Sequence, residues 1–148
     1  MRSTHPLVFA CALLLAACVA PLAQRPPGPD AGAEAAPCSG GRQRMARIEL
    51  YFGLARRGGV VSERAFADFV DGQVTPRFPA GLTLISGRGQ YRDAGGALQV
   101  EGSRLLILMV PANDAQADAR IEAIRDEYRR RFDQESVLRA DGSACVSF

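Results

Sequence analysis

Four stretches of the chain are predicted to be strands, and in the first of them apolar and polar residues alternate as is typical of a half-buried strand. The first stretch covers 46–54. The second and third cover about 82–92 and 98–110, and the turn-forming residues 93–96 between them predict a hairpin. The fourth lies within 135–148. The third stretch is apolar on both faces, which indicates a central strand that is covered on both sides.

Two other stretches carry apolar residues at helical spacing. Ser62 is expected to cap the first helix. Pro76 should end that helix one or two residues earlier, because the residue before a proline avoids the helical region. Asn113 or Asp114 is expected to cap the second helix, which would begin directly after it. Its predicted apolar face consists of Ala117, Ile121, Ile124, Tyr128 and Phe132.

The order of these elements is strand, helix, strand, strand, helix, strand. This order predicts an α+β domain of the ferredoxin-like, split βαββαβ class, with a four-stranded antiparallel sheet and two helices on one face. Its usual strand order is 4-1-3-2, so the first and last strands are antiparallel neighbours and the second strand lies at an edge. We expect residues 45–148 to form this single domain.

The first 17 residues have the form of an export signal, in which Arg2 precedes an apolar stretch over 7–17. That stretch is shorter than the roughly 20 residues that span a bilayer. The run Leu15-Ala16-Ala17-Cys18 resembles the lipobox of bacterial lipoproteins, which implies cleavage before Cys18 and lipid attachment to it. Two or more acyl chains would anchor the protein to a membrane. The alternative is an ordinary secretory signal that contains a cysteine.

The residues after Cys18 indicate where in the cell envelope the protein is expected to reside. Position 19 is valine rather than the aspartate that favours retention at the inner membrane, so we expect an exported protein on the outer membrane, facing the periplasm. Residues 18–44 are rich in Pro, Gly and Ala without apolar periodicity, and they are interpreted as a lipidated N-terminus and linker. The predicted organisation is a signal peptide over 1–17, a linker over 18–44 and a domain over 45–148.

Export would place the remaining cysteines in an oxidising compartment. With Cys11 removed and Cys18 acylated, Cys38 and Cys145 are the free thiols that remain, and an isolated pair predicts one disulfide. The predicted fold supports this pair, because Cys38 precedes the first strand and Cys145 lies near the end of the last. Closing a loop of roughly 100 residues stabilises a fold by up to about 4.7 kcal/mol. A zinc site is the alternative, but it lacks further ligands.

The composition excludes several kinds of chemistry. The single histidine, His5, lies in the export signal, and the sequence contains no lysine. The mature protein therefore has no histidine base or ligand and no lysine for a Schiff base or a phosphate loop. We assign no catalytic residue, no metal and no cofactor. The formal net charge of +2 gives no field that would recruit nucleic acid, so no nucleic-acid partner is expected.

Five separated stretches of the domain carry a family likeness. They are Glu49-Leu50-Tyr51-Phe52-Gly53-Leu54, Val74-Thr75-Pro76-Arg77-Phe78-Pro79-Ala80-Gly81-Leu82-Thr83, Gly87-Arg88-Gly89-Gln90-Tyr91, Gln134-Glu135-Ser136-Val137-Leu138 and Ala144-Cys145-Val146-Ser147-Phe148. Together they resemble a bacterial family called domain of unknown function 3574, which usually has tryptophan where this chain has Tyr91. The resemblance implies a short exported protein, often a lipoprotein. It brings no activity and no site residues.

The glycines at positions 87 and 89 do not form a nucleotide-binding loop. The third glycine of that motif is replaced by Arg92, and a hairpin strand follows where the motif needs a helix. Charges and glycines on an edge strand commonly discourage pairing with other chains. Edge protection or a dimer interface is therefore one interpretation of this stretch.

A small-ligand site is the other interpretation. The helices of such a domain leave one sheet face open, and Glu49, Tyr51, Arg88 and Glu101 would form a polar site if they converge there. Arginine forks suit carboxylates and phosphates, so a small anionic or sugar-like ligand is expected.

Two functional hypotheses follow. The first is a lipid-anchored, non-catalytic envelope protein that binds an envelope protein partner or itself as a homodimer, because the apolar third strand needs a second cover. The second is a small-ligand binder, or a histidine-independent enzyme, that uses the polar site on the open sheet face.

Overall fold

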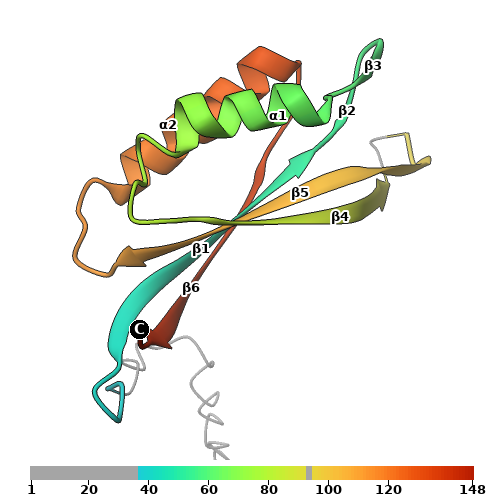
Figure 1. The fold of residues 1–148 in the computed structure, drawn as a ribbon. Coiled ribbons are helices and arrows are strands. Elements are labelled where there is room, and N and C mark those ends of the chain that lie inside the picture. Colours follow the sequence, from blue (N-terminus) through green and yellow to red (C-terminus); the bar gives the residue numbers. More distant parts are fainter. Residues whose placement is uncertain (1–36, 93–94) are drawn as a thin grey trace, which may run out of the picture. The chain divides into compact units, whose positions relative to one another are not determined.

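The computed structural model describes residues 37–92 and 95–148, which form an α+β domain (Figure 1). The predicted signal peptide, Cys18 and most of the predicted linker lie outside these residues. The main sheet is antiparallel with the strand order β4-β5-β1-β6, which confirms the predicted order. Its strands are β1 (Gln43–Gly53), β4 (Thr83–Arg92), β5 (Leu98–Pro111) and β6 (Leu138–Val146).

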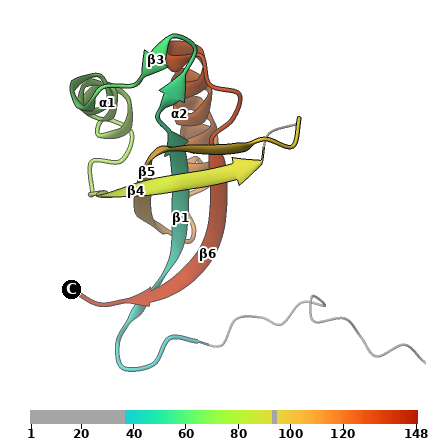
Figure 2. The same ribbon diagram turned by 90° about the vertical axis from the view of Figure 1, so that its right-hand side faces the viewer.

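Both helices cover the same side of the sheet, as the ferredoxin-like class predicts (Figure 1, Figure 2). After β1, the chain makes a small ribbon from β2 (Ala55–Arg56) and β3 (Gly59–Val60). It then enters α1 (Glu63–Phe69), which continues as a π-helical turn, η1 (Val70–Val74). The second helix, α2 (Ala117–Phe132), connects β5 to β6.

The helix starts were predicted with different success. Ser62 caps α1 as predicted, since its hydroxyl oxygen accepts a hydrogen bond of 3.2 Å from the backbone N–H of Ala65. The predicted start of α2 is wrong, because the helix begins at Ala117. The Asp114 carboxylate accepts a hydrogen bond of 3.1 Å from the backbone N–H of Gln116, and Asp114 therefore stabilises a turn that precedes the helix.

Apolar residues of the helices and the sheet form one core between the two layers. The ring of Phe52 on β1 packs edge-on against those of Phe66, Phe69 and Tyr128, with centroids 4.6 to 5.9 Å apart. All predicted apolar residues of the second helix are buried: Ala117, Ile121, Ile124, Tyr128 and Phe132. Helical spacing in the sequence therefore identified this part of the core correctly.

The sheet has one face beneath the helices and one that we call the open face. On β5, Leu106 and Leu108 are fully buried beneath the helices, whereas Leu105 and Ile107 on the open face are only partly buried. Neither helix in residues 37–92 and 95–148 covers the open face (Figure 1). The second cover that the apolar third strand suggests stays a prediction.

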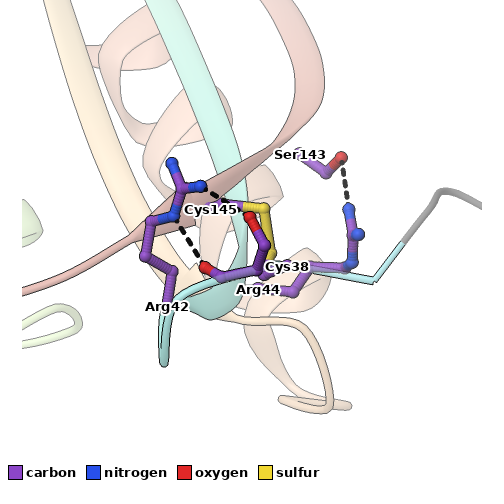
Figure 3. The surroundings of a disulfide bond; sticks show 6 residues. Cys38, Arg42, Arg44, Ser143 and Cys145 are labelled. Atoms are coloured by element: carbon purple, nitrogen blue, oxygen red, sulfur yellow. Dashed lines mark hydrogen bonds between the residues drawn. A yellow bond between two sulfur atoms is a disulfide. The ribbon is translucent and has the colours of Figure 1, made fainter.

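A disulfide joins Cys38 to Cys145 and confirms the predicted pair (Figure 3). Their Cα atoms lie 5.6 Å apart. Cys145 is paired with Arg44 in the ladder between β1 and β6, so the bond closes the sheet where β1 begins and β6 ends. The side chain of Arg42 donates to the backbone oxygen of Ser39 at 2.9 Å and so folds the turn between Cys38 and the strand.

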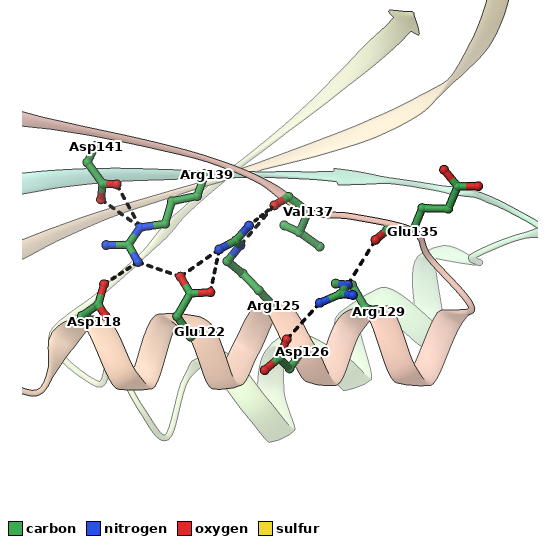
Figure 4. A network of polar contacts seen from close by, with 9 residues as sticks. All are labelled: Asp118, Glu122, Arg125, Asp126, Arg129, Glu135, Val137, Arg139 and Asp141. Atoms are coloured by element: carbon green, nitrogen blue, oxygen red, sulfur yellow. Dashed lines mark hydrogen bonds and ion pairs between the residues drawn. The ribbon is translucent and has the colours of Figure 1, made fainter. Parts of the chain in front are cut away.

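A cluster of charges joins the edge strand β6 to α2 (Figure 4). The guanidinium of Arg139 donates to Asp118 and Glu122 at 2.7 Å and to Asp141 at 3.0 Å. Arg125 also donates to Glu122 and, with Arg139, lowers the pKa of that carboxyl. Hydrogen bonds between opposite charges therefore join the edge strand β6 to α2.

Candidate functional site

An open groove of about 890 Å³ lies on the open face where β1 ends. Tyr51, Gly53 and Glu101 line it from the sheet. Other residues that line it come from the end of β4 and the first half of β5. They also come from β2 with the turn after it, and from residues 133–136 between α2 and β6. The groove therefore lies among four segments that are distant in the sequence.

The Glu101 carboxylate is positioned in this groove by a backbone N–H and lies over a glycine. A Cβ added to Gly53 would lie 2.8 Å from the Glu101 carboxylate oxygens, so a side chain at position 53 would displace this carboxylate from its present place. Gly89 is paired with Glu101 across β4 and β5, and a Cβ there would lie in ordinary contact with the Glu101 side-chain stem, at 3.8 Å. Oε2 of Glu101 accepts a hydrogen bond of 2.7 Å from the backbone N–H of Ala55. This contact fixes one carboxylate oxygen and leaves Oε1 for another partner.

Tyr51 connects the groove to a second carboxylate on the open face. Its hydroxyl donates a hydrogen bond of 2.5 Å to Oε2 of Glu49, and Nε of Arg47 donates to Oε1 of the same carboxylate at 2.7 Å. The contacts with Tyr51 and then Arg47 lower the pKa of Glu49, and the same hydrogen bond raises the pKa of Tyr51. Tyr51 therefore stays protonated, with its proton directed at Glu49.

The backbone of Gly53 is also held from the core. The hydroxyl of Tyr128 donates a hydrogen bond of 2.8 Å to the Gly53 carbonyl oxygen. Burial, and to a smaller extent the negative charge of Glu101, raise the pKa of Tyr128, which keeps this donor protonated. Gly53 thus has a core tyrosine bonded to its carbonyl and the Glu101 carboxylate above its Cα.

The loop over residues 133–136, between α2 and β6, is hydrogen-bonded to β2, and charges of both signs lie at this side of the groove. The side-chain amide of Gln134 donates to the backbone oxygen of Ala55 at 2.5 Å. Nε of Arg57 lies 3.7 Å from a carboxylate oxygen of Asp133. In the described ranges, neither the guanidinium of Arg56 nor the Glu135 carboxylate forms an ion pair.

The structure brings together three of the four residues proposed from the sequence. Glu49, Tyr51 and Glu101 all lie on the open face, and two of them line the groove. Arg88 is paired with Gly102 in the ladder between β4 and β5, in phase with the residues that face the helices. It therefore lies on the other side of the sheet and does not join the groove.

Other groove residues were not anticipated. Ser103 follows Glu101 at a spacing of two on β5 and also lines the groove, so strand alternation could have identified it. Residues 133–136 lie in a loop with no periodic signal, and their position depends on how α2 packs. Tyr91 lines the groove as well and is 53% exposed, which leaves its ring accessible to a ligand.

The parts of the chain that the structure describes contain no group of three or more histidine, cysteine or acidic residues arranged to hold a metal ion. Among those same residues, neither helix has the length and apolar character that crossing a bilayer requires.

Comparisons with known proteins place the fold and the family. The family model described as "Protein of unknown function (DUF3574)" matches residues 47–148. A search of the curated proteins found no match. A solved structure of a phage SAM lyase in complex with S-methyl-5′-thioadenosine is similar, with a TM-score of 0.54 and 18% identity over 69% of this chain and 90% of that one. The apo structure of a phage SAM lyase gives a TM-score of 0.50 and 21% identity over 76% and 97%. At this identity the likeness concerns the fold alone.

Proposed function

Because the chain belongs to the family of proteins of unknown function called DUF3574, we propose its role from its own residues. We propose a non-catalytic, lipid-anchored module of the cell envelope that binds a small ligand in the groove beside Glu101. The proposal combines the address that the first 18 residues predict with the site that lies on the open face.

The position of Glu101 is the observation that carries this proposal. A carboxylate on an exposed strand normally extends into water, where its ion pairs with other side chains are weak. Here the N–H of Ala55 holds the carboxylate at one place in the groove, over the space that the missing side chain of Gly53 leaves. A fixed acceptor with one unoccupied oxygen is ready to bind a ligand without loss of side-chain entropy.

The same groove favours binding over chemistry. General acid–base catalysis needs a group that exchanges protons near the working pH. The Tyr51 hydroxyl donates to Glu49, and the resulting hydrogen bond raises its pKa further from neutrality. A histidine-independent enzyme in the same groove is the alternative, and it would reveal itself by consumption of a bound compound.

Ligand-observed NMR on the purified full chain would test the groove. The probes are a set of amino acids, sugars, polyamines and nucleosides, which includes S-methyl-5′-thioadenosine because a protein of the same fold was solved with it. A Gly89→Trp substitution would fill the groove, while Gly87→Trp places the same side chain on the same face of β4 outside it. Neither glycine has a backbone conformation that a side chain would strain.

We expect at least one probe to bind the wild type and Gly87→Trp but not Gly89→Trp. Spectra of the free probes after incubation would show whether any compound is chemically changed. Binding that persists in Gly89→Trp would place the ligand elsewhere and refute the groove. The absence of binding by every probe class would also count against the proposal.

The anchor is tested separately. Cys18→Ser removes the thiol that would carry the lipid, so we expect the variant to lose acyl labelling and to leave the membrane fraction. Cys11→Ser is the matched control, because this cysteine lies within the predicted signal. Unchanged labelling and fractionation of Cys18→Ser would contradict lipid attachment at this residue.

Self-association on the open face is a second candidate function. Ile85 is 47% exposed there, beside the partly buried Leu105 and Ile107. The charged residues at the centre of this face, Arg47 and Glu49, already neutralise each other, so two copies would meet without repulsion. We expect a dimer by sedimentation that Ile107→Glu converts to monomer. A monomeric wild type at high concentration would exclude this role.

A further inference from the structure

The polar atoms of the groove point to one kind of ligand, if the groove binds as proposed above. Oε1 of Glu101 is an acceptor that no hydrogen bond in the described part of the chain occupies. No arginine of that part forms an ion pair with Glu101. This carboxylate therefore keeps its full charge for a ligand, in contrast to Glu49, which arginine neutralises.

Tyr51 presents a second acceptor to the groove. A tyrosine hydroxyl has one proton and two lone pairs. Since the proton is donated to Glu49, only the lone pairs of the Tyr51 oxygen remain for a ligand. The two fixed polar groups that the sheet contributes thus both accept hydrogen bonds, and they select a ligand group that donates them. An ammonium group satisfies the Glu101 acceptor, with charge pairing to the carboxylate in addition.

A positive charge, complementary to that of Glu101, comes from β2 at another side of the groove. Arg57 has Asp133 as its partner, whereas Arg56, which also lines the groove, forms no ion pair within residues 37–92 and 95–148. Arg56 directly follows Ala55, whose N–H is bonded to Glu101, so the positive and negative groups lie on neighbouring segments. An arginine fork binds a carboxylate through two parallel hydrogen bonds.

We propose that the groove binds a zwitterion of the amino-acid type, with its ammonium group on Glu101 and its carboxylate on Arg56. The remaining part of the ligand lies along the ring of Tyr91, which is 53% exposed, lines the same groove and is two residues from Gly89, the partner of Glu101. Free amino acids and the termini of short peptides share this chemistry.

Three matched compounds separate the two charges: phenylalanine, phenethylamine without the carboxylate, and 3-phenylpropionate without the ammonium. Calorimetric titration of the full chain would give their affinities. We expect phenylalanine to bind most tightly. Glu101→Gln should weaken phenylalanine and phenethylamine by about tenfold or more and leave 3-phenylpropionate unchanged. Arg56→Gln should give the converse pattern, weakening phenylalanine and 3-phenylpropionate only.

Both variants should remain folded. Glutamine at position 101 keeps an oxygen for the N–H of Ala55, and Arg56 is exposed. Asp68→Asn, an exposed charge change on α1, is the control and should alter none of the three affinities. Equal effects of Glu101→Gln on all three compounds would overturn the assignment of the ammonium group. If the series fails to bind while another probe binds in a manner sensitive to Gly89→Trp, the groove stands and the zwitterion is refuted.

Discussion

Removal of the disulfide between Cys38 and Cys145 should cost this domain a large part of its stability. The bond closes a loop with a sequence separation of 107 residues. In the chain-entropy relation, a crosslink of this length restricts the unfolded chain by about 4.8 kcal/mol at 25 °C. Domains of this size are stable by about 5–15 kcal/mol. The double variant Cys38→Ser/Cys145→Ser should therefore remain folded only marginally.

Urea unfolding followed by far-ultraviolet circular dichroism would measure this loss, since the chain contains no tryptophan for fluorescence. With a slope of about 1.5 kcal/mol per molar urea, the midpoint should fall by roughly 3 M. The slope itself should rise in the variant, because an unfolded chain without the crosslink exposes more surface. Wild-type protein unfolded in a reductant is the control and should behave as the double variant does.

The result that would refute this reasoning is a loss below about 1 kcal/mol with an unchanged slope. Such a result would mean that the ladder between β1 and β6 keeps the ends of the chain together even in the unfolded ensemble. A large loss with an unchanged slope would instead place the effect in the native state, where Cys145 is paired beside Arg44.

Three further predictions concern single side chains. Tyr128→Phe removes the donor to the Gly53 carbonyl and should lower the free energy of unfolding by about 1–2 kcal/mol, measured in urea. Because folding raises the pKa of Tyr128, wild-type stability should be full below pH of about 10 and fall above it; a variant with the same alkaline decline would contradict this. Arg139→Met leaves three carboxylates without their shared cation, so we expect a loss of about 1–3 kcal/mol that shrinks below pH of about 4, and a loss independent of pH would exclude this origin. Glu49→Gln should return the pKa of Tyr51 towards its usual value of about 10, visible as an earlier step in an absorbance titration; an unmoved step would show that Glu49 does not act on it.

Local periodicity was sufficient to predict most of the fold. Burial repeats every second residue in a strand and about every third or fourth in a helix. The spacing of apolar residues therefore predicts both the type of element and its buried face. The disulfide was predicted from an isolated pair of cysteines, and the predicted order of strands supported it because β1 and β6 are neighbours in that order. The start of α2 was missed because Asp114 is as good a residue for a turn as for a helix cap, and the hydrogen bond to Gln116 decides between them.

The candidate site could be predicted only in part. Alternation correctly grouped Glu49 with Tyr51, and it also separated Arg88 from Tyr91 on β4. Alternation does not say which of the two alternating sets of residues faces the helices, since that choice depends on register with the neighbouring strand. The pairing of Arg88 with Gly102 places the exposed arginine on the helix side of the sheet, whereas the sequence alone had left it beside Glu101.

The sequence by itself determined the order of elements, the core, the cysteine pair and the chemistry that a chain without lysine, and with its single histidine in the predicted signal, has available. These properties depend on residue type and on spacing over a few positions. Only the tertiary structure decided that Glu101 lies between Gly53 and Gly89, opposite a wall that residues 133–136 supply. Those contacts join segments up to about eighty residues apart, as the hydrogen bond from Gln134 to Ala55 does, and no local pattern encodes which distant segments will meet.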